Sequence, residues 1–427
     1  MSSGRDRYVD LLRALAICLV VSGHWLITVL AHRDGALVAP ELLATLPWTR
    51  WLTLLFQIMP VFFLAGGYAA AGSWDRHRAA GGTAARWVRQ RAVRLLLPTA
   101  AYAALALAGL ALARTAGADP GLLGMVGWAL AMQFWFLPVY LLITALTPLL
   151  AAAHRRWGAA VPAVLAAAAA AVGPTPLRDL DHLLVWAVAY QLGLCWRDGL
   201  LVRRTVLAAL AAGGAAAFAL LVAYGPYPVS LILVTGEEVS NTDPPSAAML
   251  AWAVAQCAVC LLLAPAAGRA LRPARARRAA RATAAASMAL YLWHMVPVLV
   301  LAAALYLPGL APEPAVGSGG FWALRAVWIA ALAAVLVAVL RALRPLDRVL
   351  RRLHAVARTE AEPRSPLPLV LGYAAVVPAL AYWAGHGFAH GGVLPGLAFA
   401  AGTALVLLPP AAMPAGQASA ESAEAVA

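Results

Sequence analysis

The sequence predicts an all-α protein that crosses a membrane many times. Of its 427 residues, 63% are hydrophobic and only 12% are charged, and the mean hydropathy is +0.80. Soluble proteins are nearer about half apolar and about a quarter charged. Apolar runs of about 20 residues, long enough to span a bilayer as a helix, recur along the chain. The runs are continuous, which excludes an outer-membrane barrel, and the composition excludes a soluble enzyme, a disordered chain and a disulfide-stapled module.

The apolar runs predict about 11–12 transmembrane helices within a single domain. The first run is too long for a signal peptide and is followed by further spans, so we expect a membrane anchor. We expect the domain to cover residues 1–410, with a core at about 7–343, two extra spans within 366–410 and a disordered cytoplasmic tail at 411–427. The expected spans are 9–31, 51–71, 95–113, 126–150, 158–173, 182–196, 205–224, 247–267, 283–306, 321–343, 366–384 and 393–410.

The charges predict the orientation of these spans. The formal net charge is +14, and every basic residue other than histidine is an arginine. If the N-terminus is cytoplasmic and the loops alternate, 27 of the 32 arginines fall at cytoplasmic ends. Because membrane proteins keep their basic residues inside, this distribution predicts cytoplasmic termini and a multi-pass protein of the cell membrane. It also explains the positive charge without a nucleic-acid partner.

Ionisable residues inside the first apolar run indicate a polar cavity. Arg13 and His24 are 11 residues apart, which brings them within about 20° of one helix face, and Asp10 lies about 40° from His24. His24 is roughly 16 Å deeper than Arg13 along such a helix. An ionisable group at that depth needs a partner or a function. The alternative is that Asp10 and Arg13 form a pair anchoring the helix end and His24 is a hydrogen-bonded core histidine.

Two further features accompany this face. His294 is a second histidine within an apolar run, just before Pro297, and its alternative role is an interhelical hydrogen bond. Arg91 and Arg94 form an i,i+3 pair at the cytoplasmic mouth. Guanidinium groups match phosphate oxygens, so this pair predicts a phosphate clamp. The alternative is ordinary positive-inside charge or contact with lipid headgroups.

Two other features carry weaker indications. Cys257 and Cys260 have the spacing of metal ligands, but no second pair or nearby histidine completes a zinc site, so we expect buried thiols and no metal. The longest external loop, about 225–246, carries Glu237, Glu238, Asn241 and Asp243. It is either a contact for an external substrate or a solvated turn.

Taken together, these features resemble the integral-membrane acyltransferase-3 family. The resemblance covers residues 7–297, about two-thirds of the chain. The sequence departs from the family pattern at Ala65–Gly66, where Ser–Gly is usual, and in the two spans that follow the usual ten. The matching features are Arg13 with His24 after ten intervening residues, Phe62–Tyr68, Arg91 and Arg94 with Pro98, Trp135–Leu137, and Tyr291–His294.

The resemblance implies an acyltransferase that moves an acyl group, expected to be acetyl, from cytoplasmic acyl-CoA to a hydroxyl group. The acceptor would be a cell-surface glycan, a lipid-linked sugar or a secondary metabolite. His24 would be the general base, with His294 as a second catalytic residue. Direct transfer and an acyl-histidine intermediate both stay open. Acyl-CoA is expected as cosubstrate, with no permanently bound cofactor; Arg13, Asp10, Arg91 and Arg94 would hold the donor.

An alternative function is a proton-coupled transporter or flippase in which His24 and His294 relay protons. The many helices and the intramembrane histidines favour it. The scarcity of carboxylates within the apolar runs disfavours it, because such relays commonly use them.

Overall fold

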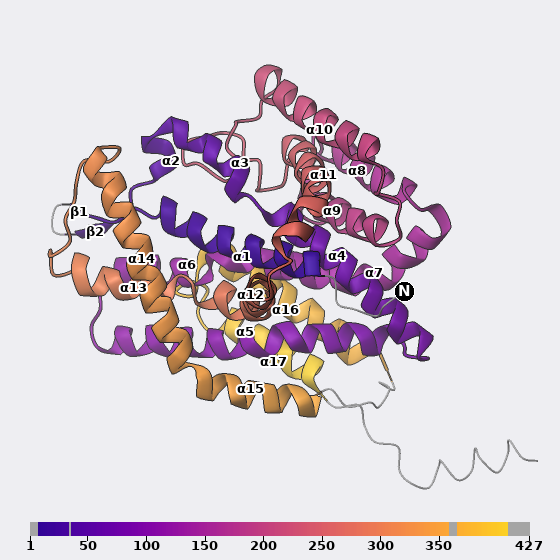
Figure 1. Ribbon diagram of the computed structural model, residues 1–427. Coiled ribbons are helices and arrows are strands. Elements are labelled where there is room, and N and C mark those ends of the chain that lie inside the picture. The colour runs from indigo at the N-terminus through magenta and orange to yellow at the C-terminus, as the bar shows by residue number, and fades with distance from the viewer. Residues whose placement is uncertain (1–6, 34–35, 358–364, 409–427) are drawn as a thin grey trace, which may run out of the picture.

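A computed structural model describes residues 7–33, 36–357 and 365–408, and these residues are almost entirely helical (Figure 1). The predicted tail at 411–427 lies outside them. A short antiparallel hairpin, β1 and β2, pairs His32 with Leu37. The elements are α1 (Arg7–Ile27), β1 (Ala31–Arg33), β2 (Ala36–Val38), α2 (Leu42–Thr45), η1 (Pro47–Leu52), α3 (Thr53–Phe56), α4 (Met59–Ala79), α5 (Ala84–Thr115), α6 (Pro120–Ala131), η2 (Met132–Trp135), α7 (Phe136–Trp157), α8 (Ala160–Val172), η3 (Arg178–Leu180), α9 (Asp181–Arg197), α10 (Arg204–Tyr224), α11 (Ala247–Ala270), α12 (Ala274–Trp293), α13 (Val296–Leu301), η4 (Ala302–Tyr306), α14 (Gly319–Ala342), α15 (Arg344–Ala357), α16 (Leu367–His386) and α17 (Leu394–Leu407).

The all-α polytopic membrane fold is confirmed. Within the described residues, eight helical segments are long and apolar enough to cross a membrane, and the bent pair of α12 with α13–η4 makes a ninth. The remaining expected spans form α8, α9 and α17, with 13, 17 and 14 residues. At 1.5 Å per residue these helices are roughly 20–26 Å long, shorter than the roughly 30 Å hydrocarbon core of a bilayer.

Several helix boundaries differ from the expected spans because a break in the helix or a capping side chain, rather than hydropathy, sets where the helix begins. The run expected at 51–71 is broken at Gln57, so residues 47–56 form short helical turns and α4 begins at Met59. The arginine-rich segment before residue 95 is helical rather than a loop. Its helix, α5, starts at Ala84 because the Thr83 side chain accepts a hydrogen bond from the Arg86 backbone N–H.

α4 and α9 approach each other closely at glycines. A Cβ atom on Gly67 would lie 1.9 Å from the carbonyl oxygen of Tyr190, and one on Gly193 would lie 2.2 Å from that of Leu64. No larger residue fits either position. Small residues are what bring helix backbones together in membranes, where packing rather than hydrophobicity drives helix association. This contact accounts for the glycine in the Phe62–Tyr68 stretch.

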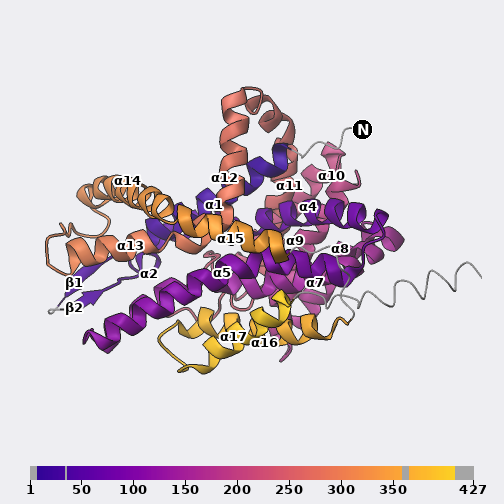
Figure 2. The ribbon, with the colours of Figure 1, turned by 90° about the horizontal axis from the view of Figure 1, so that it is seen from below.

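Of the last two helices, α17 packs along α5 and α16 packs on α17 (Figure 2). The buried Arg89 of α5 ties α17 to it by donating to the carbonyl oxygens of Val406, Leu407 and Leu408, at 3.0–3.1 Å. These carbonyls lie at the end of α17, where a helix has no backbone donors of its own for them. α16 also packs on η2, so both helices are integrated into the bundle.

The helix that carries His294 breaks at this residue. α12 ends at Trp293, α13 begins at Val296, and their axes differ by 47°. Pro297 lacks the N–H that would bond the carbonyl of Trp293, and a proline inside a helix is a regular cause of a bend. The bend therefore places an imidazole where the backbone changes direction.

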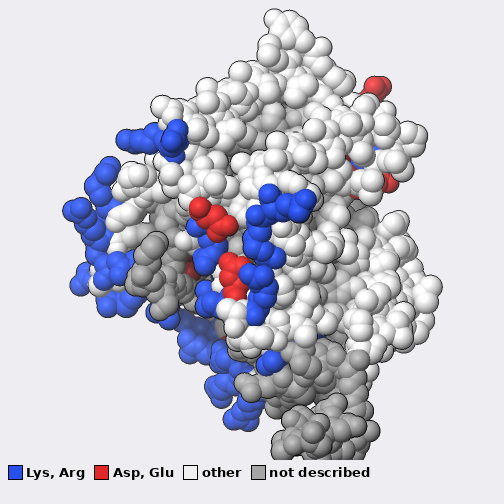
Figure 3. Space-filling view, turned by 90° about the vertical axis from the view of Figure 1, so that its right-hand side faces the viewer, with Lys and Arg blue, Asp and Glu red and all other residues white. Residues whose placement is uncertain are grey.

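α1 connects two ends of the molecule (Figure 1). We call the end that holds Arg13, Arg76 and Arg91 the basic end. The guanidinium groups of Arg13 and Arg76 both lie within electrostatic range of that of Arg91. Arginines make up most of the charged surface on this side (Figure 3). We call the opposite end, which carries β1 and β2, the hairpin end.

Candidate active site

A cavity of about 1540 Å³ follows α1 from the basic end to the hairpin end. Arg13 lines it at the basic end, His24 lines it further along, and Thr28 and Glu41 line it at the hairpin end. From Arg13 to Thr28 the helix rises roughly 22 Å. The predicted face of the first span therefore lines one continuous space. The imidazole is not at a blind end, because the cavity continues past it.

The two intramembrane histidines form a pair. Nδ1 of His24 lies 2.8 Å from Nε2 of His294, and the rings stack with centroids 5.0 Å apart. His294 is fully buried. Each histidine is thus the other's hydrogen-bond partner, across 270 residues of sequence.

The hydrogen bonds assign the protons on both rings. Nδ1 of His294 lies 2.8 Å from the carbonyl oxygen of Tyr291, and because a carbonyl only accepts, this nitrogen carries a hydrogen. In the neutral ring, Nε2 of His294 is then an acceptor, so His24 donates its Nδ1–H to it. The lone pair of His24 is consequently on Nε2.

A second set of hydrogen bonds fixes the segment that carries His294. Trp25 donates from Nε1 to the carbonyl oxygen of His294 at 2.7 Å. Tyr291 donates its hydroxyl to the backbone carbonyl of Gln133 at 2.6 Å. The Gln133 amide nitrogen donates to the carbonyl of Leu130 at 2.8 Å and contacts the Tyr102 hydroxyl at 3.2 Å. α1, η2 and α5 therefore hold the histidine pair from three sides.

The predicted donor-binding residues divide into two groups. Arg13 lines the cavity, and Arg91 lies within electrostatic range of it, with its guanidinium 5.1 Å from the Trp87 ring centroid. Asp10 is buried and Arg94 is exposed, and neither is among the described residues that line the cavity. Of the four predicted donor-binding residues, Arg13 therefore lines the cavity, whereas Asp10, Arg91 and Arg94 are not among its described lining residues. Arg91 is nevertheless close enough to Arg13 to interact with it electrostatically.

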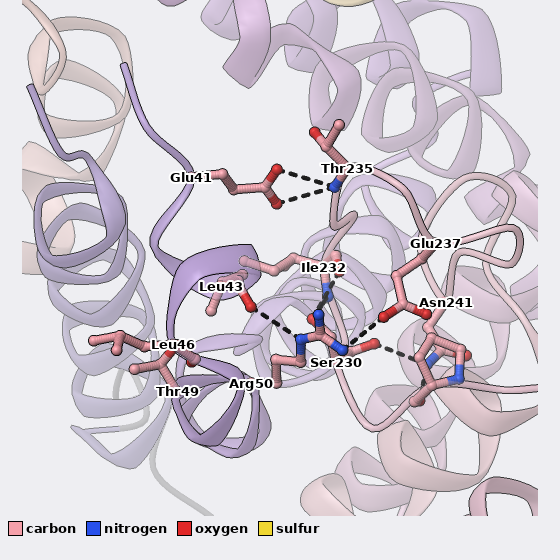
Figure 4. A network of polar contacts seen from close by, with 11 residues as sticks. Glu41, Leu43, Leu46, Thr49, Arg50, Ser230, Ile232, Thr235, Glu237 and Asn241 are labelled. Atoms are coloured by element: carbon pink, nitrogen blue, oxygen red, sulfur yellow. Dashed lines mark hydrogen bonds and ion pairs between the residues drawn. The ribbon is translucent and has the colours of Figure 1, made fainter. Parts of the chain in front are cut away.

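At the hairpin end, the loop of residues 225–246 packs on the segment 41–57 (Figure 4). The Glu41 carboxylate accepts from the Thr235 backbone N–H with both oxygens, at 3.0 and 3.1 Å. Arg50 pairs with Glu237 at 2.6 Å. Inside the loop, the fully buried Asn241 donates to the carbonyls of Pro228 and Ser230.

This loop contributes to the cavity wall. Thr235, Thr242 and Asp243 line the cavity, together with His182 at the start of α9. The His182 Nε2 lies 3.3 Å from the Asp243 carboxylate. The hydrogen bond from this imidazole lowers the pKa of the Asp243 carboxyl below its ordinary value. The mouth at the hairpin end therefore offers carboxylates, hydroxyls and an imidazole, which are groups that hydrogen-bond a polar molecule.

Within the described residues, no group of three or more His, Cys, Asp and Glu side chains is gathered as a metal ion requires. Cys257 is buried and Cys260 is partly buried, and both are free thiols.

The fold and the cavity define a polytopic membrane protein in which one histidine of a hydrogen-bonded pair, His24, lines a passage that is basic at one mouth and polar at the other. A family model of the acyltransferase domain, Acyl_transf_3, matches residues 6–342 of the chain. The chain therefore belongs to the acyltransferase-3 family and is a membrane acyltransferase. Comparison with curated proteins and with solved structures gives no significant match.

Sequence reasoning did not identify Gln133, Tyr102 or Trp25 as supports of the site. Gln133 carries a detectable signal, since it is a polar amide in an otherwise apolar run. Tyr102 and Trp25 carry none, because aromatic residues in membrane helices are usually part of the packing. The His24–His294 contact requires the tertiary fold.

Proposed function

We propose that this acyltransferase moves an acyl group from acyl-CoA to a hydroxyl group, with His24 as the general base and His294 holding its ring. The observation that carries the proposal is that His24 lines a cavity reaching both ends of α1 while its ring is hydrogen-bonded to the buried His294. The two mouths differ in chemistry, as expected when two different substrates enter from opposite sides.

The basic mouth suits the donor. Coenzyme A carries phosphates at one end and its thioester at the other, joined by a long flexible arm. Arg13 and Arg91 supply guanidinium groups for phosphate oxygens. His24 lies roughly 16 Å further along α1 than Arg13. Phosphates held at the mouth would leave the thioester beside the imidazole.

The proton positions suit base catalysis. The lone pair on Nε2 of His24 takes the proton of the acceptor hydroxyl as its oxygen attacks the thioester carbonyl carbon. The carbon–sulfur bond then breaks, and the imidazolium returns the proton to the leaving thiolate of coenzyme A. During this step His294 accepts the Nδ1–H bond of the charged ring. It therefore acts as the orienting third group of a nucleophile–base arrangement, here as a neutral imidazole.

The polar mouth suits the acceptor, for which we propose a hydroxyl-bearing glycan or secondary metabolite. Because cytoplasmic ends of membrane proteins are basic, we propose that the basic end and the N-terminus face the cytoplasm and that the protein resides in the cell membrane. The acceptor would then enter from outside, past the loop 225–246.

The test is acyl transfer from radiolabelled acyl-CoA to membrane glycans and extractable metabolites in cells that express the full chain. His24→Ala should lower transfer by a factor of about 10² to 10⁴, the contribution of a general base. His154→Ala is the matched control, because His154 is also buried but lies outside the cavity, paired with Asp198. Transfer that survives in His24→Ala, or substrate export that needs no acyl donor, would contradict the proposal.

A further inference from the structure

One part of the cavity has no role in the reaction just described. Past His24 the cavity has an apolar branch, which we define by its lining residues on α5, α6 and α13–η4. None of these described residues is charged. They include Tyr102, Leu105 and Gly109 on α5, and Leu307 directly after η4 continues the same lining.

The lining of the apolar branch extends from residues near the histidine pair to residues exposed at the surface of the protein. At its inner end, Tyr102 contacts the Trp293 ring edge-on with centroids 5.0 Å apart, next to His294 in sequence. At its outer end, Leu105 and Leu307 are 49% and 45% exposed. Along α5, the lining runs from Tyr102 to Ala113, which is roughly 16 Å.

We propose that the apolar branch binds the hydrocarbon chain of the donor's acyl group, so that the donor carries a fatty acyl chain rather than acetyl. This inference rests on the proposed function, which places the thioester carbonyl beside His24. The acyl chain is bonded to that carbonyl carbon and must extend away from it. The branch is the uncharged space that starts there, and it receives the chain on the side away from the coenzyme.

The charges at the hairpin end argue against another hydrocarbon occupant, the tail of a phosphate-linked lipid acceptor. Such a lipid carries phosphate between its tail and the sugar to be acylated. Among the described residues that line the cavity past His24, the acidic and histidine side chains are Glu41, Asp243 and His182. Two carboxylates repel a phosphate, and no arginine lines this part to attract it. An acyl chain bonded to the donor brings no charge into the branch.

The proposal predicts that binding depends on chain length. Moving one methylene from water into an apolar environment changes an equilibrium constant by about fourfold. Octanoyl-CoA should therefore bind at least about tenfold more tightly than acetyl-CoA, even if part of its chain stays exposed at the outer opening.

Gly109 allows the apolar branch to be filled without strain. It lines the cavity in the last third of α5, and no heavy atom lies within 4 Å of a Cβ built on it. Gly109→Leu adds apolar bulk there and favours the helix. Gly213→Leu is the matched control, since Gly213 is also a helical glycine with open space around it, on α10, none of whose described residues lines the cavity.

The experiment measures the affinity of the purified full chain, in lipid nanodiscs, for acetyl-CoA and for octanoyl-CoA, with empty nanodiscs subtracted. Gly109→Leu should weaken octanoyl-CoA binding about tenfold and leave acetyl-CoA binding unchanged, and Gly213→Leu should change neither. A photoreactive group at the chain terminus should crosslink to α5 residues 102–113 or to residues 296–307.

The outcomes separate the two proposals. Equal affinity of the wild type for both thioesters, equal weakening of both by Gly109→Leu, or crosslinks elsewhere would overturn the acyl-chain site while leaving acyl-CoA as donor. If neither thioester binds, and free coenzyme A does not bind either, the proposed function itself would be overturned.

Discussion

Removal of the His294 imidazole tests the pairing on which the proposed chemistry depends. In His294→Ala, His24 loses the acceptor of its Nδ1–H bond, now 2.8 Å long. The Trp25 bond is retained because it goes to the backbone carbonyl of residue 294. The variant therefore removes the ring contact while keeping the link between α1 and the bend after α12.

The expected decrease in kcat follows from the positive charge that develops on His24 during the reaction. A hydrogen bond to a charged group contributes about 1.5–3 kcal/mol, and this bond is charge-assisted only when His24 holds the acceptor's proton. Loss of 1.5–3 kcal/mol of transition-state stabilisation corresponds to a decrease in kcat of roughly tenfold to 150-fold. Because substrates do not need this bond in order to bind, KM for acyl-CoA should stay within about twofold.

The assay is release of coenzyme A by purified protein in nanodiscs, with the acceptor supplied as the membrane or metabolite fraction that becomes labelled in cells. His154→Ala measures the effect of truncating a buried histidine elsewhere and should retain nearly full kcat. A His294→Ala enzyme that turns over within threefold of the wild type, or one in which only KM changes, would refute the orienting role of His294.

Four other substitutions test separate parts of the structure. Arg13→Gln should raise KM for acyl-CoA about tenfold with little change in kcat, since it removes a guanidinium contact to phosphate. Steady-state kinetics measures both constants, and a change in kcat alone would contradict this role. Gly67→Ala should destabilise the fold by about 3 kcal/mol or more, because its Cβ has no room between α4 and α9, and chemical unfolding measures this. Glu41→Ala should expose the loop 225–246 to limited proteolysis, because its two bonds to the loop backbone are lost; unchanged cleavage would show that the loop is held by other contacts. Arg89→Leu should lower the free energy of unfolding by about 3 kcal/mol, since three carbonyls lose their donor, without altering KM.

Much of the fold follows from the sequence because each membrane helix carries its own signal. Apolar runs mark the positions of the helices, and the turn of 100° per residue places Arg13 and His24 on one face, which the structure shows lining one cavity. The boundaries were less predictable. The Thr83 cap starts α5 within an arginine-rich stretch, and the break at Gln57 moves the start of α4 to Met59. An average of hydropathy over a window of residues detects neither feature.

The individual residues of the site could be predicted from the sequence, but the contacts between residues far apart in the sequence could not. His24 and His294 are each conspicuous in an apolar run, but their contact joins positions 270 residues apart and depends on the bend at His294. Arg91 and Arg94 form an equivalent pair in the sequence. The structure distinguishes them, since Arg91 is partly buried and within electrostatic range of Arg13 whereas Arg94 is exposed. The two extra helices could be located, but the contact of α16 with η2 could not.

The central claim is that the donor lies along α1 with its reacting end at the histidine pair. An electron cryo-microscopy structure of the full chain with coenzyme A tests it most directly. We predict phosphate density at Arg13 and Arg91, and the coenzyme sulfur within hydrogen-bonding reach of Nε2 of His24. Coenzyme A bound outside this cavity, or bound with its thiol at the basic mouth and its phosphates beyond His24, would contradict the account.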